Sequence, residues 1–117
     1  MPVDTVVVHS EQTAWGVHVV YINGNIICNL SGTPVRKEIE RLLKTEKPRI
    51  VLNIKDVRYL DSYSFGWLAN MCKETKKKGG RFVLSNPNTD IANLIEMLSF
   101  NKAMEVFGTE AEAIASM

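Results

Sequence analysis

The five residues Ile50–Ile54 (I-V-L-N-I) form an almost uninterrupted apolar run near the middle of the 117-residue chain. A short run of this kind lacks the alternation of a half-buried strand and is typical of a strand that is covered on both faces. Such a strand needs helices packed against the sheet. The run therefore predicts a parallel or mixed sheet and a fold of the α/β class.

Strands and helices are predicted to alternate along the rest of the chain. Short β-branched and aromatic runs indicate strands, whereas apolar residues at helical spacing, preceded by capping residues, indicate helices. They predict a single α/β domain over residues 1–117, with a mixed β-sheet of about four to five strands packed against about four α-helices. The predicted strands are 6–8, 15–22, 25–28, 50–54, 81–85 and 104–107, and helices are predicted to begin at Thr33, at Asp61 or Ser62, within 86–90 and at Thr109.

The dipeptide Asn23-Gly24 interrupts the strand-forming residues near the N-terminus. Asn-Gly is a common sequence of tight turns, so a turn is predicted between the strand at 15–22 and the apolar piece at 25–28. The segment Asn23–Asn25 is not predicted to bind phosphate as a loop, because neither glycine-rich nucleotide-binding pattern occurs in the sequence.

The composition gives no sign of a catalytic or metal site. Cys28 and Cys72 lack metal-ligand spacing and are predicted to be reduced core residues, and His9 and His18 have no partner at triad or metal-ligand spacing. The formal net charge of +1 gives no bulk electrostatic argument for a nucleic-acid or membrane partner. No segment has the roughly 20 apolar residues that span a bilayer, and no secretory signal is visible, so a soluble, cytoplasmic protein without a cofactor is expected.

The segment Tyr59–Trp67 (Y-L-D-S-Y-S-F-G-W) follows the buried strand and begins the next predicted helix. Asp61 or Ser62 can cap this helix, a contact worth about 1 kcal/mol. A serine at this place is also exposed beside unpaired backbone N–H groups, at the positive end of the helix dipole, where a phosphoryl group would be stabilised. The junction therefore fits both a structural cap and a phosphorylation switch.

Other residues of this helix leave two alternatives open. Tyr63, Trp67 and Met71 follow at intervals of four on a face beside the apolar core stripe. They either pack under a neighbouring segment or form a contact surface for a partner protein. Gly66 disfavours a helix by about 1 kcal/mol, which predicts that another segment approaches closely there.

Four segments together resemble the STAS domain of bacterial anti-sigma factor antagonists. In that family, the serine directly after the aspartate of the strand–helix junction is phosphorylated by a partner kinase that also acts as an anti-sigma factor. By this resemblance, the phosphorylated serine corresponds to Ser62 and its aspartate to Asp61, whereas Tyr63 and Ser64 replace a small residue and a glycine that are common in the family. The segments are I-V-L-N-I-K-D-V-R-Y-L-D-S-Y-S-F-G-W-L, K-K-K-G-G-R-F-V-L-S-N-P, I-A-N-L-I-E-M-L-S-F and M-E-V-F-G-T-E-A-E-A-I.

The resemblance implies a binding protein in a partner-switching system and not an enzyme. The expected partners are an anti-sigma factor with serine kinase activity and a serine phosphatase, without nucleic acid or membrane insertion; a homodimer is left open. Ser62 is the expected phosphorylation site and Ser64 a secondary candidate. Two other functions are left open, a non-switched adaptor subunit of a transporter or sensory complex and a domain that binds a small molecule or anion. The expected partner-binding residues are Asn23, Gly24, Asn25, Asp61, Ser62, Tyr63, Ser64 and Trp67.

Overall fold

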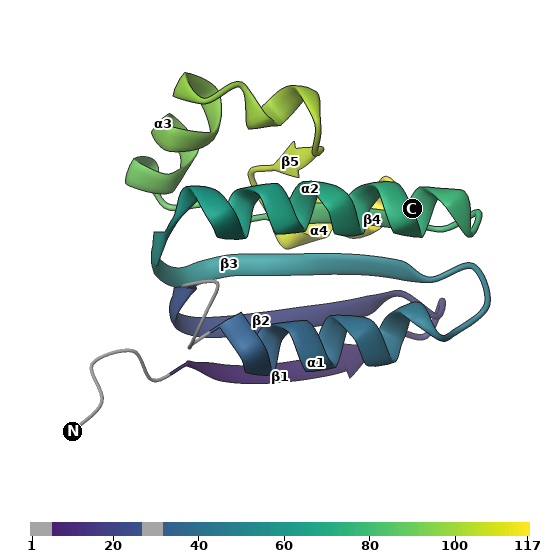
Figure 1. Ribbon diagram of the computed structural model, residues 1–117. Coiled ribbons are helices and arrows are strands. Elements are labelled where there is room, and N and C mark those ends of the chain that lie inside the picture. Colours follow the sequence, from purple (N-terminus) through teal and green to yellow (C-terminus); the bar gives the residue numbers. More distant parts are fainter. Residues whose placement is uncertain (1–5, 27–31) are drawn as a thin grey trace.

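A five-stranded mixed sheet forms the centre of the computed structural model, which describes residues 6–26 and 32–117 (Figure 1). The strands lie in the order in which they occur in the chain, and β1 pairs antiparallel with β2, whereas the other neighbours are parallel. The mixed sheet predicted from the sequence is confirmed. The strands are β1 (Val7–Gln12), β2 (His18–Ile26), β3 (Arg49–Leu60), β4 (Arg81–Ser85) and β5 (Val106–Phe107).

Helices connect the parallel strands and cover both faces of the sheet. Helices α1 and α2 lie side by side on one face, and α4 lies on the opposite face (Figure 1). Each parallel strand pair is joined through a helix, α1 after β2, α2 after β3 and α3 after β4. The helices are α1 (Gly32–Leu43), α2 (Ser62–Lys77), α3 (Thr89–Met97) and α4 (Glu110–Ala115), with a short 3-10 helix, η1, at Phe100–Lys102.

Each face of the sheet has its own core. Phe65 and Leu68 of α2 belong to the larger core together with Leu52 of β3, whereas Val51 of β3 belongs to a smaller core under Ala113 of α4. Successive residues of β3 thus enter different cores, as expected for a strand with two buried faces. This explains why the run Ile50–Ile54 is apolar at nearly every position.

A polar contact fastens α4 to the sheet. Asn53 of β3 donates a hydrogen bond from Nδ2 to Oε1 of Glu110 at 3.0 Å. Burial, with a hydrogen bond to the same carboxylate, raises the pKa of Tyr21 to about 12. Thr109 caps α4 by accepting the N–H of Glu112 at 3.2 Å, so the predicted start of this helix at Thr109 is confirmed. Glu110 therefore joins the short helix to β2 and β3.

The predicted turn at Asn23-Gly24 is wrong, because both residues lie inside β2. The pairing of β2 with β3 shifts register twice, between Tyr21 and Asn23 and between Gly24 and Asn25, which are irregularities of the β-bulge type. Gly24 has a φ of 130°, which a glycine adopts without steric cost. Pairing along a long neighbouring strand outweighs the local turn preference of the dipeptide.

β3 extends six residues beyond the predicted end of the strand, to Leu60 instead of Ile54, and begins one residue earlier, at Arg49. Ile54, Val57 and Leu60 are buried while the residues between them are exposed. A spacing of three does not match the alternation of a regular strand. At each register shift β3 has one more residue than β2, between Asn53 and Asp56 and between Val57 and Tyr59. The sequence pattern therefore did not reveal the second half of the strand.

Two sequence expectations fall on parts of the chain outside the described structure. These are the burial of Cys28 and the capping side chain of Thr33. The helix that Thr33 was expected to cap begins at Gly32, two residues before Pro34. Cys72, the other cysteine, is free and partly buried, as predicted.

The close approach predicted at Gly66 is wrong, because a Cβ placed there would meet no atom within 4 Å. We expect Gly66→Ala to raise the free energy of unfolding by about 0.5–1 kcal/mol, since alanine stabilises a helix interior relative to glycine. Urea denaturation measures this change. Gly80→Ala is the matched control and should be destabilising, because its Cβ would lie 2.0 Å from the carbonyl oxygen of Pro48. A loss of stability in Gly66→Ala would contradict the open space at this position.

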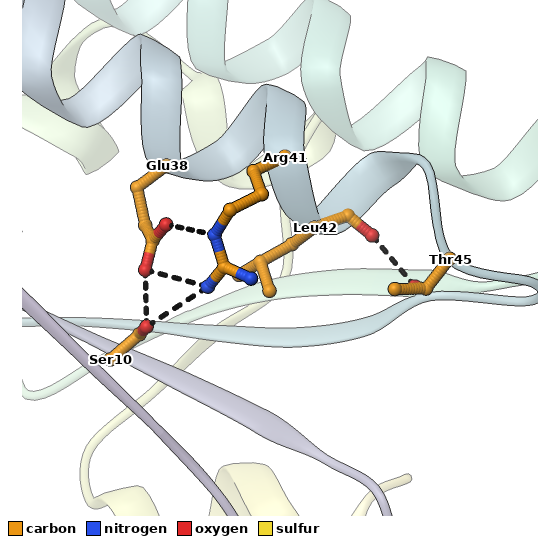
Figure 2. Close-up of polar contacts among 5 residues, drawn as sticks. All are labelled: Ser10, Glu38, Arg41, Leu42 and Thr45. Atoms are coloured by element: carbon orange, nitrogen blue, oxygen red, sulfur yellow. Dashed lines mark hydrogen bonds and ion pairs between the residues drawn. The ribbon is translucent and has the colours of Figure 1, made fainter.

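Polar side chains join α1 to the edge strand β1 (Figure 2). The carboxylate of Glu38 accepts hydrogen bonds from the hydroxyl of Ser10 and from Arg41, whose Nε lies 2.6 Å from Oε1 and whose Nη2 lies 3.0 Å from Oε2. At the end of the helix, Thr45 donates from Oγ1 to the carbonyl of Leu42 at 2.7 Å. The hydrogen bond from Arg41, opposed in part by burial and reinforced by Ser10, lowers the pKa of Glu38 from 4.5 to about 2.

The lowered pKa of Glu38 predicts a loss of stability in acid. Its contribution is fully present above pH 4.5 and is lost as the pH falls toward 2, because the folded state then takes up the proton less readily than the unfolded chain. Solvent screens the pair of Glu38 and Arg41, since the side chain of Arg41 is 61% exposed. We therefore expect the carboxylate of Glu38 to contribute about 1 kcal/mol to the free energy of unfolding. Thermal unfolding of Glu38→Gln and the unmodified chain at pH 7 and pH 3 measures it. An undiminished difference between the two proteins at pH 3 would contradict the assignment.

Candidate functional site

Asp61 caps the N-terminus of α2 at its junction with β3. Its Oδ1 accepts the N–H of Ser64 at 2.8 Å, and its backbone carbonyl accepts the N–H of Phe65 at 3.1 Å. Ser62 is the first residue of α2 and is exposed, and its hydroxyl makes no hydrogen bond with any residue that the structure describes. The sequence left Asp61 and Ser62 open as the cap. The structure assigns that role to Asp61 and leaves the hydroxyl of Ser62 facing solvent.

Ser64, two residues further on, is buried with 2% of its surface exposed. Its hydroxyl donates to the carbonyl oxygen of Ile26 at 3.2 Å, and the N–H of Asp61 donates to the same oxygen at 3.4 Å. Ser64 therefore ties the start of α2 to the end of β2. It lies beneath the surface on which Ser62 is exposed.

The aromatic residues of α2 divide between the two alternatives that the sequence left open. Tyr63 is 77% exposed, next to Ser62. Trp67 and Met71 are partly buried and pack against the larger core. The guanidinium carbon of Arg36 in α1 lies 5.2 Å from the centre of the Trp67 ring, which is a cation–π distance. Tyr63 thus remains a surface group, whereas Trp67 mainly joins α2 to α1.

The register of β2 on β3 places the predicted residues of segment 23–25 at different distances from the junction. Asn25 lies opposite Tyr59, one pair before the last pair of the two strands, whereas Asn23 lies opposite Asp56, further back. Tyr59 is 51% exposed and was not among the predicted site residues. Tyr59 was missed because the predicted strand ended at Ile54. The signal that could have found it is the presence of a tyrosine on each side of Asp61-Ser62, at positions 59 and 63.

The two histidines and Cys72 lie in separate surroundings in the described part of the chain. His9 is exposed, stacks on Tyr21 with ring centres 6.0 Å apart and lies 3.3 Å from Glu11. Burial and the nearby Arg41 lower the pKa of His18. Burial, assisted by Glu105, raises the pKa of Cys72 to about 12, which disfavours the reactive thiolate.

Residues 6–26 and 32–117 contain no group of three or more His, Cys, Asp or Glu side chains that could hold a metal ion. No helix in this part of the chain is both long enough and apolar enough to cross a membrane.

Solved structures with the same arrangement of strands and helices include anti-sigma factor antagonists. A crystal structure of an anti-sigma factor antagonist from Mycobacterium paratuberculosis superimposes with a TM-score of 0.84 at 20% identity, covering 97% of this chain and 94% of that one. The antagonist SpoIIAA in its unphosphorylated form gives a TM-score of 0.71 at 19% identity, covering 94% and 95% of the two chains. At these identities the comparison establishes the fold.

Sequence comparison reaches the same group. An anti-sigma F factor antagonist from Paenibacillus polymyxa is 24% identical over 102 residues, 87% of each chain. A relative from Thermotoga maritima is 29% identical over 66 residues, which are 56% of this chain and 58% of that protein, so the match spans less than two thirds of the relative's length. The family model of the STAS domain matches residues 10–113. The chain therefore belongs to the STAS domain family.

Proposed function

We propose that this chain is an anti-sigma factor antagonist that binds an anti-sigma factor with serine kinase activity, and that phosphorylation of Ser62 switches the binding off. The observation that carries the proposal is the exposed hydroxyl of Ser62 at the first position of α2, beside an aspartate that already caps the helix. Because Asp61 supplies the cap, modification of Ser62 does not remove it.

The position of Ser62 also explains how a phosphoryl group would be held there and would weaken binding. At the start of α2, a phosphoryl group on Ser62 would face N–H groups that lack intrahelical acceptors and the positive end of the helix dipole. It adds a charge of about −1.5 to −2. Tyr63 and Tyr59 are exposed on either side of Ser62 in the sequence, so the charge would arise within the surface that we propose for the partner. A surface that binds through aromatic groups is weakened by a desolvated, unpaired charge.

Two similar proteins support this proposal, one through its role and the other through its phosphorylated form. The Paenibacillus relative is an anti-sigma F factor antagonist. The fold is also similar to SpoIIAA from Bacillus in its phosphorylated form, with a TM-score of 0.68 at 20% identity, covering 94% of this chain and 98% of that one. A serine phosphatase that removes the phosphoryl group would complete the cycle.

The test is phosphorylation by an anti-sigma factor kinase from the same organism. We expect incubation with the kinase and ATP to add one phosphoryl group, found on Ser62 by mass spectrometry, and to weaken binding of the kinase by about 10- to 100-fold in calorimetry. Ser62→Ala should bind the kinase and remain unmodified, whereas Ser64→Ala, the matched control, should still be phosphorylated. Modification that persists in Ser62→Ala would refute the assignment of the site.

A non-switched adaptor is the competing function. STAS-like folds also occur in anion transporters, since a sulfate transporter family protein from Wolinella succinogenes gives a TM-score of 0.66 at 19% identity, a likeness of fold. The exposed Tyr63, adjacent to Ser62, would suit a permanent contact. An adaptor would bind its partner equally well with serine or aspartate at position 62. Equal affinity of the unmodified chain and Ser62→Asp for the captured partner would therefore favour the adaptor over the switch.

A further inference from the structure

A cavity of about 540 Å³ lies at the end of the sheet where β2 and β3 begin. Its volume falls within the range of about 300–1,000 Å³ that is common for small-molecule sites. One wall comes from the turn before β2, another from α4 and the residues that follow it, and all lining side chains except one are apolar. The lining residues are Trp15, Val17, Arg49, Ala111, Ile114, Ala115 and Met117.

Trp15 stands at the rim of this cavity with 73% of its surface exposed. The turn that carries it is held by hydrogen bonds, from the N–H of Thr13 to the carbonyl of Val17 at 2.8 Å and from the N–H of Gly16 to the carbonyl of Thr13 at 3.0 Å. The hydroxyl of Thr13 also accepts the N–H of Val17 at 3.1 Å. A large exposed ring on an ordered turn, beside an apolar hollow, is a contact surface for a ligand.

Arg49 is the one charged residue in the lining. Its guanidinium donates to the backbone carbonyl of Trp15, and it packs against Gly16, where a Cβ would lie 3.1 Å from Nη2. No acidic side chain in the described part of the chain lies within ion-pair distance of it. A guanidinium has five N–H donors, so most of its hydrogen-bonding capacity stays open to an anionic group.

On the side away from the apolar walls, Arg49 lies beside charged residues of both signs. A second cavity of about 510 Å³ shares Arg49 and Met117 with the first and is also lined by Glu46, Lys47 and Arg81. Arg81 is paired with Glu105, with 2.5 Å between Nη2 and Oε2. The shared boundary of the two cavities therefore offers a cation without a carboxylate partner next to a continuous apolar surface.

We propose that this cavity binds a medium-chain fatty acid, with the hydrocarbon chain against Trp15, Ile114 and Met117 and the carboxylate on Arg49. An apolar hollow favours the chain through burial, and the unpaired guanidinium selects an anionic head group in the bidentate geometry that arginine forms with carboxylates. An uncharged or cationic amphiphile would fill the same hollow but leave Arg49 without a partner.

The site is separate from the phosphorylation site. Arg49 is the first residue of β3, and Ser62 follows its last residue by two, so the two sites lie at opposite ends of a twelve-residue strand, on the order of 35 Å apart. Ligand binding is therefore expected to be the same in Ser62→Asp as in the unmodified chain. Failure of either proposal leaves the other standing.

Calorimetric titration of the full chain with decanoate tests the site. We expect one binding site per chain, at least about tenfold weaker binding of hexanoate because fewer methylenes are buried, and at least about tenfold weaker binding of decyltrimethylammonium. Trp15 fluorescence in Trp67→Phe should change with the same midpoint. Absence of saturable decanoate binding, or equal affinity for the cationic amphiphile, would overturn the proposal.

Matched substitutions locate the binding. Ala111→Phe fills the cavity and should weaken decanoate binding by at least about tenfold, whereas Ala103→Phe, an exposed alanine outside it, should have no effect. Arg49→Gln removes the charge while keeping a donor for the Trp15 carbonyl, and should weaken decanoate binding about tenfold without weakening the binding of decyltrimethylammonium. Far-UV circular dichroism confirms that each variant is folded. Unchanged decanoate affinity in folded Ala111→Phe or Arg49→Gln would refute the site.

Discussion

Phe65→Ala is expected to lower the free energy of unfolding by about 3–5 kcal/mol, a large part of the roughly 5–15 kcal/mol that stabilises a typical domain. The side chain of Phe65 is 1% exposed, and its ring stacks on that of Phe100 with centres 4.8 Å apart and planes 15° apart. Removing it leaves a cavity between α2, the sheet and the segment that contains η1.

Urea denaturation of Phe65→Ala and Tyr63→Ala gives a matched comparison within one helix. Tyr63 is 77% exposed, so its truncation should change stability by less than about 0.5 kcal/mol. The two variants also separate stability from binding. Tyr63→Ala should remain folded and lose affinity for the proposed partner, whereas similar losses of stability in both variants would contradict the orientation of α2.

Ser64→Asp is expected to destabilise the protein by about 3 kcal/mol or more. A carboxylate at this buried position would be desolvated, and the carbonyl oxygen of Ile26 would lose the hydroxyl donor that now lies 3.2 Å from it. Ser62→Asp places the same charge at the exposed first position of the helix. There the dipole makes it neutral or stabilising by up to about 1 kcal/mol.

Thermal and urea unfolding of the two aspartate variants would separate the roles of the two serines. A folded Ser62→Asp and a strongly destabilised Ser64→Asp would agree with one exposed and one buried hydroxyl. Equal stability of the two variants would contradict the burial of Ser64. Ser64→Ala serves as the control for Ser64→Asp, because it removes the hydrogen bond without adding a charge.

Much of the fold follows from local chemistry that the sequence displays. β4 has the predicted bounds Arg81–Ser85, and the predicted caps of α2 and α4 are formed by Asp61 and Thr109. The two caps were predictable because a capping side chain acts within four residues of its own position. The alternation of strands and helices then restricts the possible sheets to a few arrangements.

The misplaced elements depend on contacts between distant residues. Whether Asn23-Gly24 forms a turn or continues the strand is decided by pairing with Asp56 and Val57, more than 30 residues later in the chain. The different exposures of Ser62 and Ser64 likewise depend on the carbonyl of Ile26 at the end of another strand. Neighbouring residue types do not identify such distant partners, so the start of the helix at Asp61 or Ser62 was predictable from the sequence but the burial of Ser64 was not.

During synthesis, each strand of this sheet can join an edge that already exists. The spatial order of the strands is their order along the chain, and the helix that follows each of β2, β3 and β4 is made before the next strand is required. Contacts between successive elements keep the sequence separation of early pairings small, which favours rapid folding. As it leaves the ribosome, the nascent chain never has to break a formed strand pair to admit a later strand.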